Sequence, residues 1–261
     1  MARTHWKRKW DIVANRIRFL EANLDTLNFN ETIDQIEVYI KNRTPVHHTG
    51  VNADKINLMK KNPRFKRIIN EAALINPDGM SVVLAAKLLR KPALERVAGI
   101  DVMLHLLEQA AIKGYRVYFL GTSEAILDKL IAKVKRDYPT LPIAGYHHGF
   151  FNEAQEEDVV AQVKASDADL LFVALPSPQK EFFVDQYMDE MGVPVSIGVG
   201  GSFDVIAGEL KRAPKWMQRC SLEWVYRMMQ EPKRLAKRYV VGNLVFLDHV
   251  LREKRTRKRP A

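Results

Sequence analysis

The most informative part of this 261-residue sequence is Gly198-Val-Gly-Gly-Ser-Phe-Asp-Val-Ile-Ala-Gly208, closely followed by Lys211-Arg-Ala-Pro214. Val195-Ser-Ile197 before it predicts a short buried strand, and Ser202 is of a residue type that caps helices. Glycines let a backbone approach a ligand closely, and the first turn of a helix attracts anions. A turn that needs glycine only for steric reasons explains the same residues, but the basic segment that follows favours an anionic ligand.

Apolar runs alternate with amphipathic stretches before this turn, as in βαβ units. Asp169-Leu-Leu-Phe-Val-Ala-Leu175 is a continuous apolar run of the kind that parallel sheets bury on both faces. Further strands are predicted at residues 116–120, 142–146 and 193–197, and helices at 29–41, 81–90, 124–137 and 153–165. The sequence therefore predicts an α/β fold with a Rossmann-like, mostly parallel sheet and helices on both faces.

Composition divides the chain into four parts. We predict a basic N-terminal extension (1–28), an α/β catalytic domain (29–210), a helical basic appendage (211–251) and a basic disordered tail (252–261). The segment from Lys211 onward has 15 Lys or Arg and four Asp or Glu, a balance of +11, so the rest of the +10 chain carries −1. Such a segment suits nucleic acid, an anionic membrane surface or a phosphorylated substrate.

Several classes of protein are disfavoured by composition. No uninterrupted apolar run approaches the roughly 18 residues that cross a bilayer, and the N-terminus lacks the apolar core of a signal peptide. The single Cys220 rules out an internal disulfide and is too little for a structural zinc site. We therefore expect a cytosolic chain.

Polar groups follow several of the predicted strands. They are Asn52, Asp78, Gly121, His147 or His148, the Gln179-Lys180-Glu181 turn, and the segment from Gly200 to Asp204. Asn52 is either a helix cap or a ligand contact, and Asp78-Gly79 is either a turn or the place of a catalytic carboxylate. A general base together with glycine and lysine for phosphates suits a sugar-nucleotide transferase.

A metal site is not predicted. Asp167-Ala-Asp169 matches the short D-x-D of metal-dependent glycosyltransferases, but it precedes a predicted strand, whereas α/β sites lie beyond the carboxyl ends of strands. His147 and His148 are adjacent, point in different directions and lack a third ligand with suitable spacing. We expect neither a metal nor a cofactor.

Longer motifs carry a family resemblance. In order they are Asn76-Pro-Asp-Gly79, Glu95-Arg-Val-Ala-Gly99, Gly145-Tyr-His-His-Gly-Phe-Phe151, Leu171-Phe-Val-Ala-Leu-Pro-Ser-Pro-Gln-Lys-Glu181, the 198–214 segment and Leu222-Glu-Trp-Val-Tyr-Arg227. They resemble the bacterial N-acetylmannosaminyltransferase family of wall teichoic acid, enterobacterial common antigen and exopolysaccharide synthesis, glycosyltransferase family twenty-six. The resemblance covers roughly residues 30 to 247.

The resemblance implies an inverting, metal-independent transferase. It would move a sugar, typically N-acetylmannosamine, from UDP to a polyprenyl-diphosphate-linked sugar as a peripheral enzyme at the inner face of the cell membrane. The family's base falls on Asp78, its substrate-binding arginine on Arg96 and its active-site asparagine on Asn52. Two arginines of its C-terminal appendage, which act on the diphosphate and help the enzyme meet the membrane, fall on Arg227 and Arg234.

The chain departs from the family at three places, one of which is Lys237, with Arg238 beside it, where the third appendage arginine of the family falls. The family threonine aligns with Gly50, and the nearest hydroxyl is that of Thr49. Relatives have Lys-Gln-Glu where this chain has Gln179-Lys180-Glu181, a change that bears on donor choice. The predicted substrate-binding set is therefore Thr49, Asn52, Arg96, Gly121, Gln179, Lys180, Glu181, Gly200, Gly201, Asp204, Arg227 and Arg234, with Asp78 as catalytic base.

Other functions remain open at this point. Within the same class, the donor is UDP-glucose or a UDP-uronic acid of exopolysaccharide assembly. A nucleotide-binding oxidoreductase would need a Gly-x-Gly-x-x-Gly and an acidic ribose ligand, and Gly121 stands alone. A nucleic-acid-binding protein would use the basic segment but leave the strand-end groups without a role. We expect as partners a UDP-sugar, the lipid-linked acceptor and an anionic membrane surface, with no nucleic acid and with a homo-oligomer left open.

Overall fold

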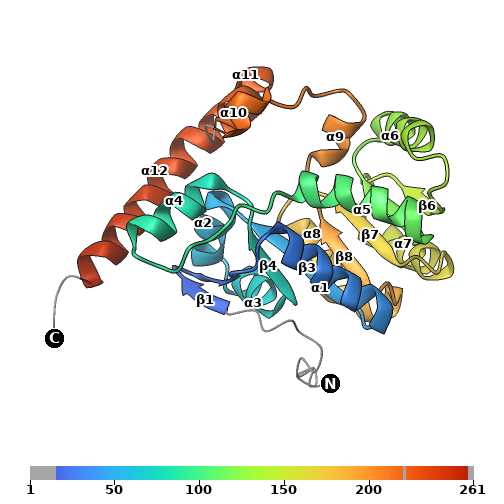
Figure 1. Ribbon diagram of the computed structural model, residues 1–261, viewed down its shortest axis with the longest axis horizontal. Helices are drawn as coiled ribbons and strands as arrows, with labels where there is room; N and C mark the ends of the chain where they lie inside the picture. The colour runs from blue at the N-terminus through green and yellow to red at the C-terminus, as the bar shows by residue number, and fades with distance from the viewer. Residues whose placement is uncertain (1–15, 220–221, 258–261) are drawn as a thin grey trace.

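A six-stranded sheet with helices on both faces forms the centre of the computed structural model, which describes residues 16–219 and 222–257 (Figure 1). The strand order is β4-β3-β8-β7-β5-β6, and every pairing is parallel. The strands of this sheet are β3 (Val46–Val51), β4 (Leu74–Pro77), β5 (Val117–Gly121), β6 (Ile143–His147), β7 (Leu170–Ala174) and β8 (Val195–Gly198). The predicted α/β fold with a parallel sheet is confirmed.

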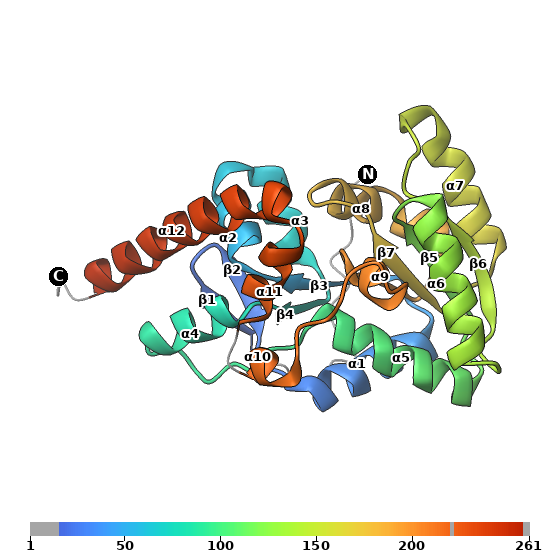
Figure 2. The ribbon, with the colours of Figure 1, turned by 90° about the horizontal axis from the view of Figure 1, so that it is seen from above.

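One face of the sheet is covered by helices α1 (Phe29–Asn42), α5 (Gly99–Lys113), α6 (Glu124–Asp137) and α9 (Ser202–Ile206). Helices α2 (Ala53–Lys61), α3 (Pro63–Glu71), α4 (Met80–Leu88), α7 (Glu153–Ala165) and α8 (Gln179–Met191) cover the other. The apolar core of this second face consists of two clusters, one under β3 and β4 and one under β5 and β7. Figure 2 shows the sheet edge-on between its helices.

Residues 16–25 lie in the range 1–28 that we predicted to be a basic N-terminal extension, and they are folded onto the domain. They form a hairpin of β1 (Arg16–Phe19) and β2 (Ala22–Asp25). The buried Asp25 carboxylate pairs with Arg16 at 2.7 Å and accepts a hydrogen bond from the Ile75 amide, so it ties the hairpin to the edge of the main sheet. Phe19 lies in the apolar core with Phe246 of the last helix. These residues are part of the fold, and residues 1–15 lie outside the described part.

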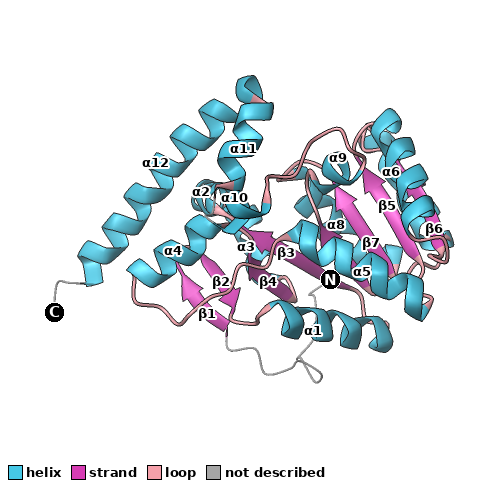
Figure 3. Ribbon diagram, turned by 45° about the horizontal axis from the view of Figure 1, so that its top comes forward, coloured by secondary structure: helices cyan, strands magenta, loops and turns pink. Residues whose placement is uncertain are grey.

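The chain after Pro214 is helical, as predicted. It forms α10 (Lys215–Arg219), α11 (Glu223–Gln230) and α12 (Pro232–Arg257), and Glu231-Pro232 interrupts the helix (Figure 3). Phe246 and Val250 bury one face of α12 in the core under β3 and β4. The helix continues six residues into the range 252–261 that we predicted to be disordered, and residues 258–261 lie outside the described part. None of the helices in the described chain is long and apolar enough to span a bilayer.

Two buried histidines lie side by side in the sequence of β3. His48 Nε2 is 2.9 Å from Asn76 Oδ1, and the Asn76 amide donates to Thr32 Oγ1, so the neutral His48 ring carries its proton on Nε2. Burial lowers the pKa of His47 from 6.5 to about 3 and the pKa of His48 to about 4. Between about pH 4 and pH 6.5, both rings therefore stay neutral in the folded protein, whereas they would be charged in the unfolded chain.

We predict that this pair makes the fold sensitive to acid. The unfolded chain binds both protons below about pH 6.5 and the folded protein does not until about pH 4 to 3, so stability present above pH 6.5 is lost as the pH falls. Each proton contributes a slope of up to about 1.4 kcal/mol per pH unit. Urea unfolding from pH 7 to 4 should show this slope, and the His47→Gln, His48→Gln double variant should lose most of it. An unchanged slope in the double variant would show that other groups cause the acid sensitivity.

Candidate active site

Asp78 follows β4 directly at the carboxyl edge of the sheet. Its amide donates to the Val51 carbonyl at 2.9 Å, which extends the pairing with β3 by one residue. Its side chain lies against Gly50 of β3: a Cβ on Gly50 would be 2.8 Å from Asp78 Cβ. Asp78 Oδ1 accepts a hydrogen bond from the Gly99 amide at 3.3 Å. The half-buried carboxylate thus lies between β3 and the start of α5, where parallel α/β proteins bind ligands.

Asn52 is the N-cap of α2, so the first of its two predicted roles is confirmed. Its Oδ1 accepts from the Lys55 amide at 3.1 Å. Its Cβ would be 3.2 Å from a Cβ on Gly79, so the cap lies beside the residue that follows Asp78. No described residue is bonded to the Asn52 Nδ2 group, and this leaves the amide nitrogen for a ligand.

Lys55, Lys180 and Glu181 form a buried ionic cluster between the two apolar clusters of the second face. Lys55 Nζ lies 3.0 Å and Lys180 Nζ 3.3 Å from the same Glu181 Oε1, which also accepts from Ser177 Oγ at 2.8 Å. All three side chains are at most 8% exposed. Lysine is unfavourable in the first turn of a helix, so Lys55 at the start of α2 was a signal that the sequence reasoning missed.

Burial and charge act on this cluster together. Burial lowers the pKa of Lys180 to about 8, with Lys55 adding to the shift and Glu181 and Asp78 opposing it. Burial alone would raise the pKa of Glu181, but Lys55 and Lys180 outweigh it and hold that pKa well below its usual range. The cluster, with two lysines and one glutamate, therefore carries a net positive charge. Its Lys180 lies close enough to Asp78 for the two charges to interact.

Thr49 does not lie where substrate would reach it. Its hydroxyl is fully buried and accepts from Lys55 Nζ at 2.7 Å. Successive residues of a strand face opposite sides of a sheet, so Thr49 faces the ionic cluster while Gly50 faces Asp78. Thr49 therefore helps to hold Lys55 in place. The side chain of Asp78 has room beside β3 because Gly50 has no side chain.

The glycine-rich turn brings Arg227 to the same edge. A Cβ on Gly201 would be 1.9 Å from Arg227 Nη2, so only glycine allows the guanidinium to lie on this turn. Asp204 Oδ2 lies beside Gly201, and no described residue accepts a hydrogen bond from the amides of Gly200 or Gly201. The predicted cap at Ser202 is wrong: Ser202 is inside α9, and its hydroxyl donates to the Val199 carbonyl because Gly201 occupies the cap position.

The remaining predicted residues are placed as follows. Gly121, with φ +130°, ends β5 so close to Ala174 that a Cβ would be 2.6 Å from its carbonyl carbon. Gln179 is the exposed first residue of α8. Gly198 lies against Lys180 on one side, and its carbonyl lies near Gly99. Arg234 is in α12, but its side chain is outside what the structure describes.

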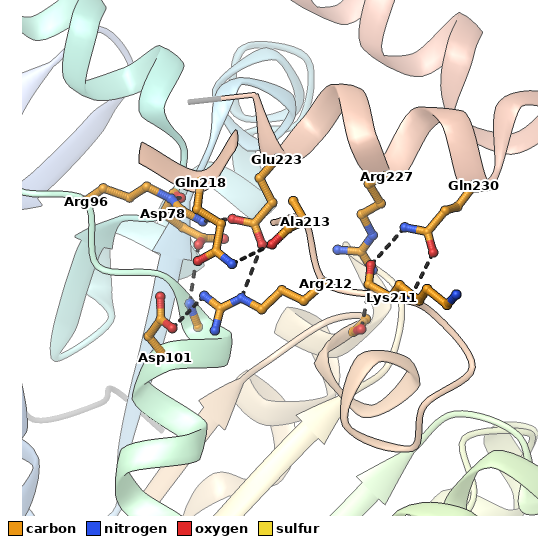
Figure 4. Close-up of polar contacts among 12 residues, drawn as sticks. Asp78, Arg96, Asp101, Lys211, Arg212, Ala213, Gln218, Glu223, Arg227 and Gln230 are labelled. Carbon is orange, nitrogen blue, oxygen red and sulfur yellow. Dashed lines mark hydrogen bonds and ion pairs between the residues drawn. The ribbon is translucent and has the colours of Figure 1, made fainter. Parts of the chain in front are cut away.

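An ion-pair network that we did not predict connects the appendage to Asp78 (Figure 4). Arg96 Nε donates to the Asp78 carbonyl at 3.0 Å, and Arg96 Nη2 donates to Glu223 of α11 at 2.7 Å. Glu223 is also 3.6 Å from Arg212 Nε, and Arg212 Nη2 donates to Asp101 at 2.6 Å. Two of these contacts, Arg96 with Glu223 and Arg212 with Asp101, join residues more than 100 positions apart and leave no local signal in the sequence.

The D-x-D segment has a structural role. Arg43 pairs with Asp167 and with Asp169 at 2.7 and 2.8 Å, and Asp169 Oδ2 also accepts from the Arg116 amide. Both carboxylates lie at the amino end of β7, at the edge of the sheet opposite to Asp78. Their bonds to Arg43 and Arg116 link α1 to the sheet.

The fold and site define a Rossmann-like α/β protein whose binding edge is completed by a helical appendage. The sequence model of the Glycosyl transferase WecG/TagA/CpsF family matches residues 17–260. The chain therefore belongs to this family and is a glycosyltransferase. The match also includes the hairpin and most of the basic tail, which we had placed outside the family resemblance.

Three curated relatives carry the name N-acetylglucosaminyldiphosphoundecaprenol N-acetyl-beta-D-mannosaminyltransferase. The Bacillus spizizenii W23 protein is 38% identical over 77% of this chain and 76% of its own length. The Bacillus subtilis 168 protein is 33% identical over 90% and 92%, and the Staphylococcus aureus MW2 protein 26% over 94% and 95%. These relatives agree with a glycosyltransferase of cell-surface polysaccharide synthesis and set aside the oxidoreductase alternative.

Proposed function

We propose that this protein transfers N-acetylmannosamine from UDP to a polyprenyl-diphosphate-linked sugar, with inversion and without a metal. The observation that carries the proposal is the position of Asp78, a carboxylate at the carboxyl edge of the sheet with Arg96 on its carbonyl. The names of the relatives support both the sugar and the acceptor.

The reaction is a single displacement at the anomeric carbon. Asp78 accepts the proton of the acceptor hydroxyl as that oxygen forms the new bond to carbon, and the bond from the anomeric carbon to the diphosphate oxygen breaks. The electron pair leaves on UDP. In this mechanism Arg96, Arg227 and the amides of Gly200 and Gly201, which donate to no described residue, bind this negative charge, which is the work that a metal does elsewhere.

A screen of UDP-sugars tests this function. UDP release should be fastest with UDP-N-acetylmannosamine, should require a synthetic polyprenyl-diphosphate N-acetylglucosamine and should persist in excess chelator. The absence of acceptor-dependent release with any UDP-sugar would contradict the function. Loss of release in chelator, with recovery on adding magnesium or manganese, would contradict the metal-independent mechanism.

We also propose that α12 brings the enzyme, as a peripheral protein, to the inner face of the cell membrane. Its side away from the core exposes an apolar stripe at the spacing of one helix face, and the side chains are 39–63% exposed: Val240, Leu244, Leu247 and Leu251. Arg252, Lys254 and Arg255 follow the stripe and would meet anionic lipid headgroups. The other side of α12 packs on the domain through Phe246 and Val250, which leaves this stripe as the side available to a membrane surface.

Charging this stripe should release the protein from membranes. Leu244→Glu with Leu247→Glu is expected to weaken binding to anionic vesicles by at least about tenfold, because each buried leucine contributes about 1.5–3 kcal/mol. Transfer to a short, soluble acceptor should be kept. The control is Ile112→Glu on α5, a side chain that is 71% exposed and distant in sequence from the stripe. Equal sedimentation of the double variant and the control with vesicles would contradict the role of α12.

A further inference from the structure

Glu223 is the first residue of α11, and its carboxylate contacts two guanidinium groups. One belongs to the α/β domain, and the other to the segment that leads from this domain to α10. Glu223 Oε2 accepts from Arg96 Nη2 at 2.7 Å, and Oε1 is 3.6 Å from Arg212 Nε. The three side chains are 24–25% exposed, so solvent screens these charges only partly. Figure 4 shows Glu223 above Asp78, pointing from the appendage toward Arg96 and Arg212.

Arg96 is held from two sides. Its Nε is bonded to the carbonyl of the catalytic Asp78 and its Nη2 to Glu223, while Nη1 is bonded to no described residue. The guanidinium group is planar and rigid, so two bonds at Nε and Nη2 fix the direction of Nη1 as well. One carboxylate from the appendage thus determines how Arg96 faces a ligand next to Asp78.

Glu223 is itself fixed by the opposite side of the site. Arg212, which approaches Glu223 Oε1, donates through Nη2 to Asp101 in the first turn of α5. The same helix begins at Gly99, whose amide donates to Asp78 Oδ1. Asp78, Arg96, Glu223, Arg212 and Asp101 therefore form a closed arrangement in which Glu223 is the only member from helices α10–α12.

We propose that Glu223 is a positioning residue that fixes Arg96 for the substrate diphosphate whenever α11 is docked. The proposal rests on the proposed function, since it assigns the diphosphate to Arg96. A free arginine samples many rotamers, and fixing it before substrate binds removes that entropy loss from the binding step. Docking of α11 also brings Arg227 onto Gly201, so the appendage prepares both arginines at once.

The chain offers a matched control on the same helix. Gln230, at the end of α11, also holds this helix in place, on the segment that leads from the α/β domain to α10: its Oε1 accepts from the Lys211 amide at 2.8 Å and its Nε2 donates to the Lys211 carbonyl at 2.9 Å. Gln230 does not contact Arg96. If Glu223 served only to dock α11, Gln230→Ala and Glu223→Gln would have similar effects.

The experiment compares kcat and KM of the full chain with UDP-N-acetylmannosamine and the lipid-linked acceptor. Glu223→Gln is expected to lower kcat/KM by about 10–100-fold. Gln230→Ala should change it less than about threefold. Adding Glu223→Gln to Arg96→Lys should cause little further loss, because Glu223 acts through Arg96. Equal losses in the Glu223 and Gln230 variants, or a full additional loss in the double variant, would overturn the proposal.

A second readout does not depend on activity. Phenylglyoxal modification of Arg96, measured by mass spectrometry of its peptide, should be faster in Glu223→Gln than in the wild-type protein and in Gln230→Ala. An unchanged rate would overturn the positioning role even in an active enzyme. A different result is also possible: the modification rate rises in Glu223→Gln, but the wild-type protein transfers no sugar. That result would contradict the proposed function, while the positioning of Arg96 by Glu223 would stand.

Discussion

Replacing Asp78 by Asn is expected to lower turnover by about 10²–10⁴-fold while UDP binds almost as tightly as before. Asparagine keeps the shape of the side chain but cannot accept the proton of the acceptor hydroxyl. The contacts of Asp78 with Val51 and with Arg96 use its backbone amide and carbonyl, so they survive the substitution. Stopped assays of UDP release give the turnover, and calorimetry with UDP gives the affinity.

Asp167→Asn is the control for this experiment. Asp167 is exposed, pairs with Arg43 and lies at the opposite edge of the sheet, so its loss should change turnover less than about twofold. Near-wild-type turnover of the Asp78 variant would show that another group accepts the proton. A large loss in the Asp167 variant would mean that the D-x-D segment takes part in the reaction after all.

Replacing Glu181 by Gln is expected to lower the free energy of unfolding by about 3–5 kcal/mol. The substitution leaves the buried ammonium groups of Lys55 and Lys180 without their shared carboxylate. Adding Lys180→Met should recover part of the loss, because it removes one of the two positive charges. Urea unfolding at pH 7 measures both variants.

An exposed ion pair is the control for the buried cluster. Asp137→Asn breaks the ion pair between Asp137 and Lys133, two side chains that are each 37% exposed. This substitution should lower the free energy of unfolding by no more than about 1 kcal/mol. If Glu181→Gln cost no more than this control, the cluster would not be electrostatically essential. If Lys180→Met worsened the Glu181 variant, packing rather than repulsion would explain the loss.

Much of the fold followed from local patterns. The helix at residues 124–137 has the predicted bounds because Ser123 caps it and its apolar residues keep helical spacing. The hairpin at residues 16–25 was missed because its strands have four residues each, and its stability comes from Asp25 and from burial of Phe19 under α12. Such short strands depend on partners far away in the sequence.

The candidate site was predictable only where it lies directly at strand ends. Asp78, Asn52 and Gly201 follow from the rule that parallel strands end at one edge, and the structure brings the first two together beside Gly79. Glu223 was not singled out, because an acidic residue in the first turn of a helix already has a local explanation in the helix dipole. Thr49 was assigned by its place next to Gly50, and strand alternation turns its side chain away from Asp78.

The most direct test of the account is the product itself. The protein, chelator, UDP-N-acetylmannosamine and the polyprenyl-diphosphate N-acetylglucosamine acceptor are incubated together, and the lipid fraction is analysed by mass spectrometry and NMR. We predict a lipid-linked disaccharide whose new linkage has the anomeric configuration opposite to that of the donor, formed by the wild-type protein and not by Asp78→Asn. Retained configuration, or equal product from both proteins, would contradict direct displacement with Asp78 as base.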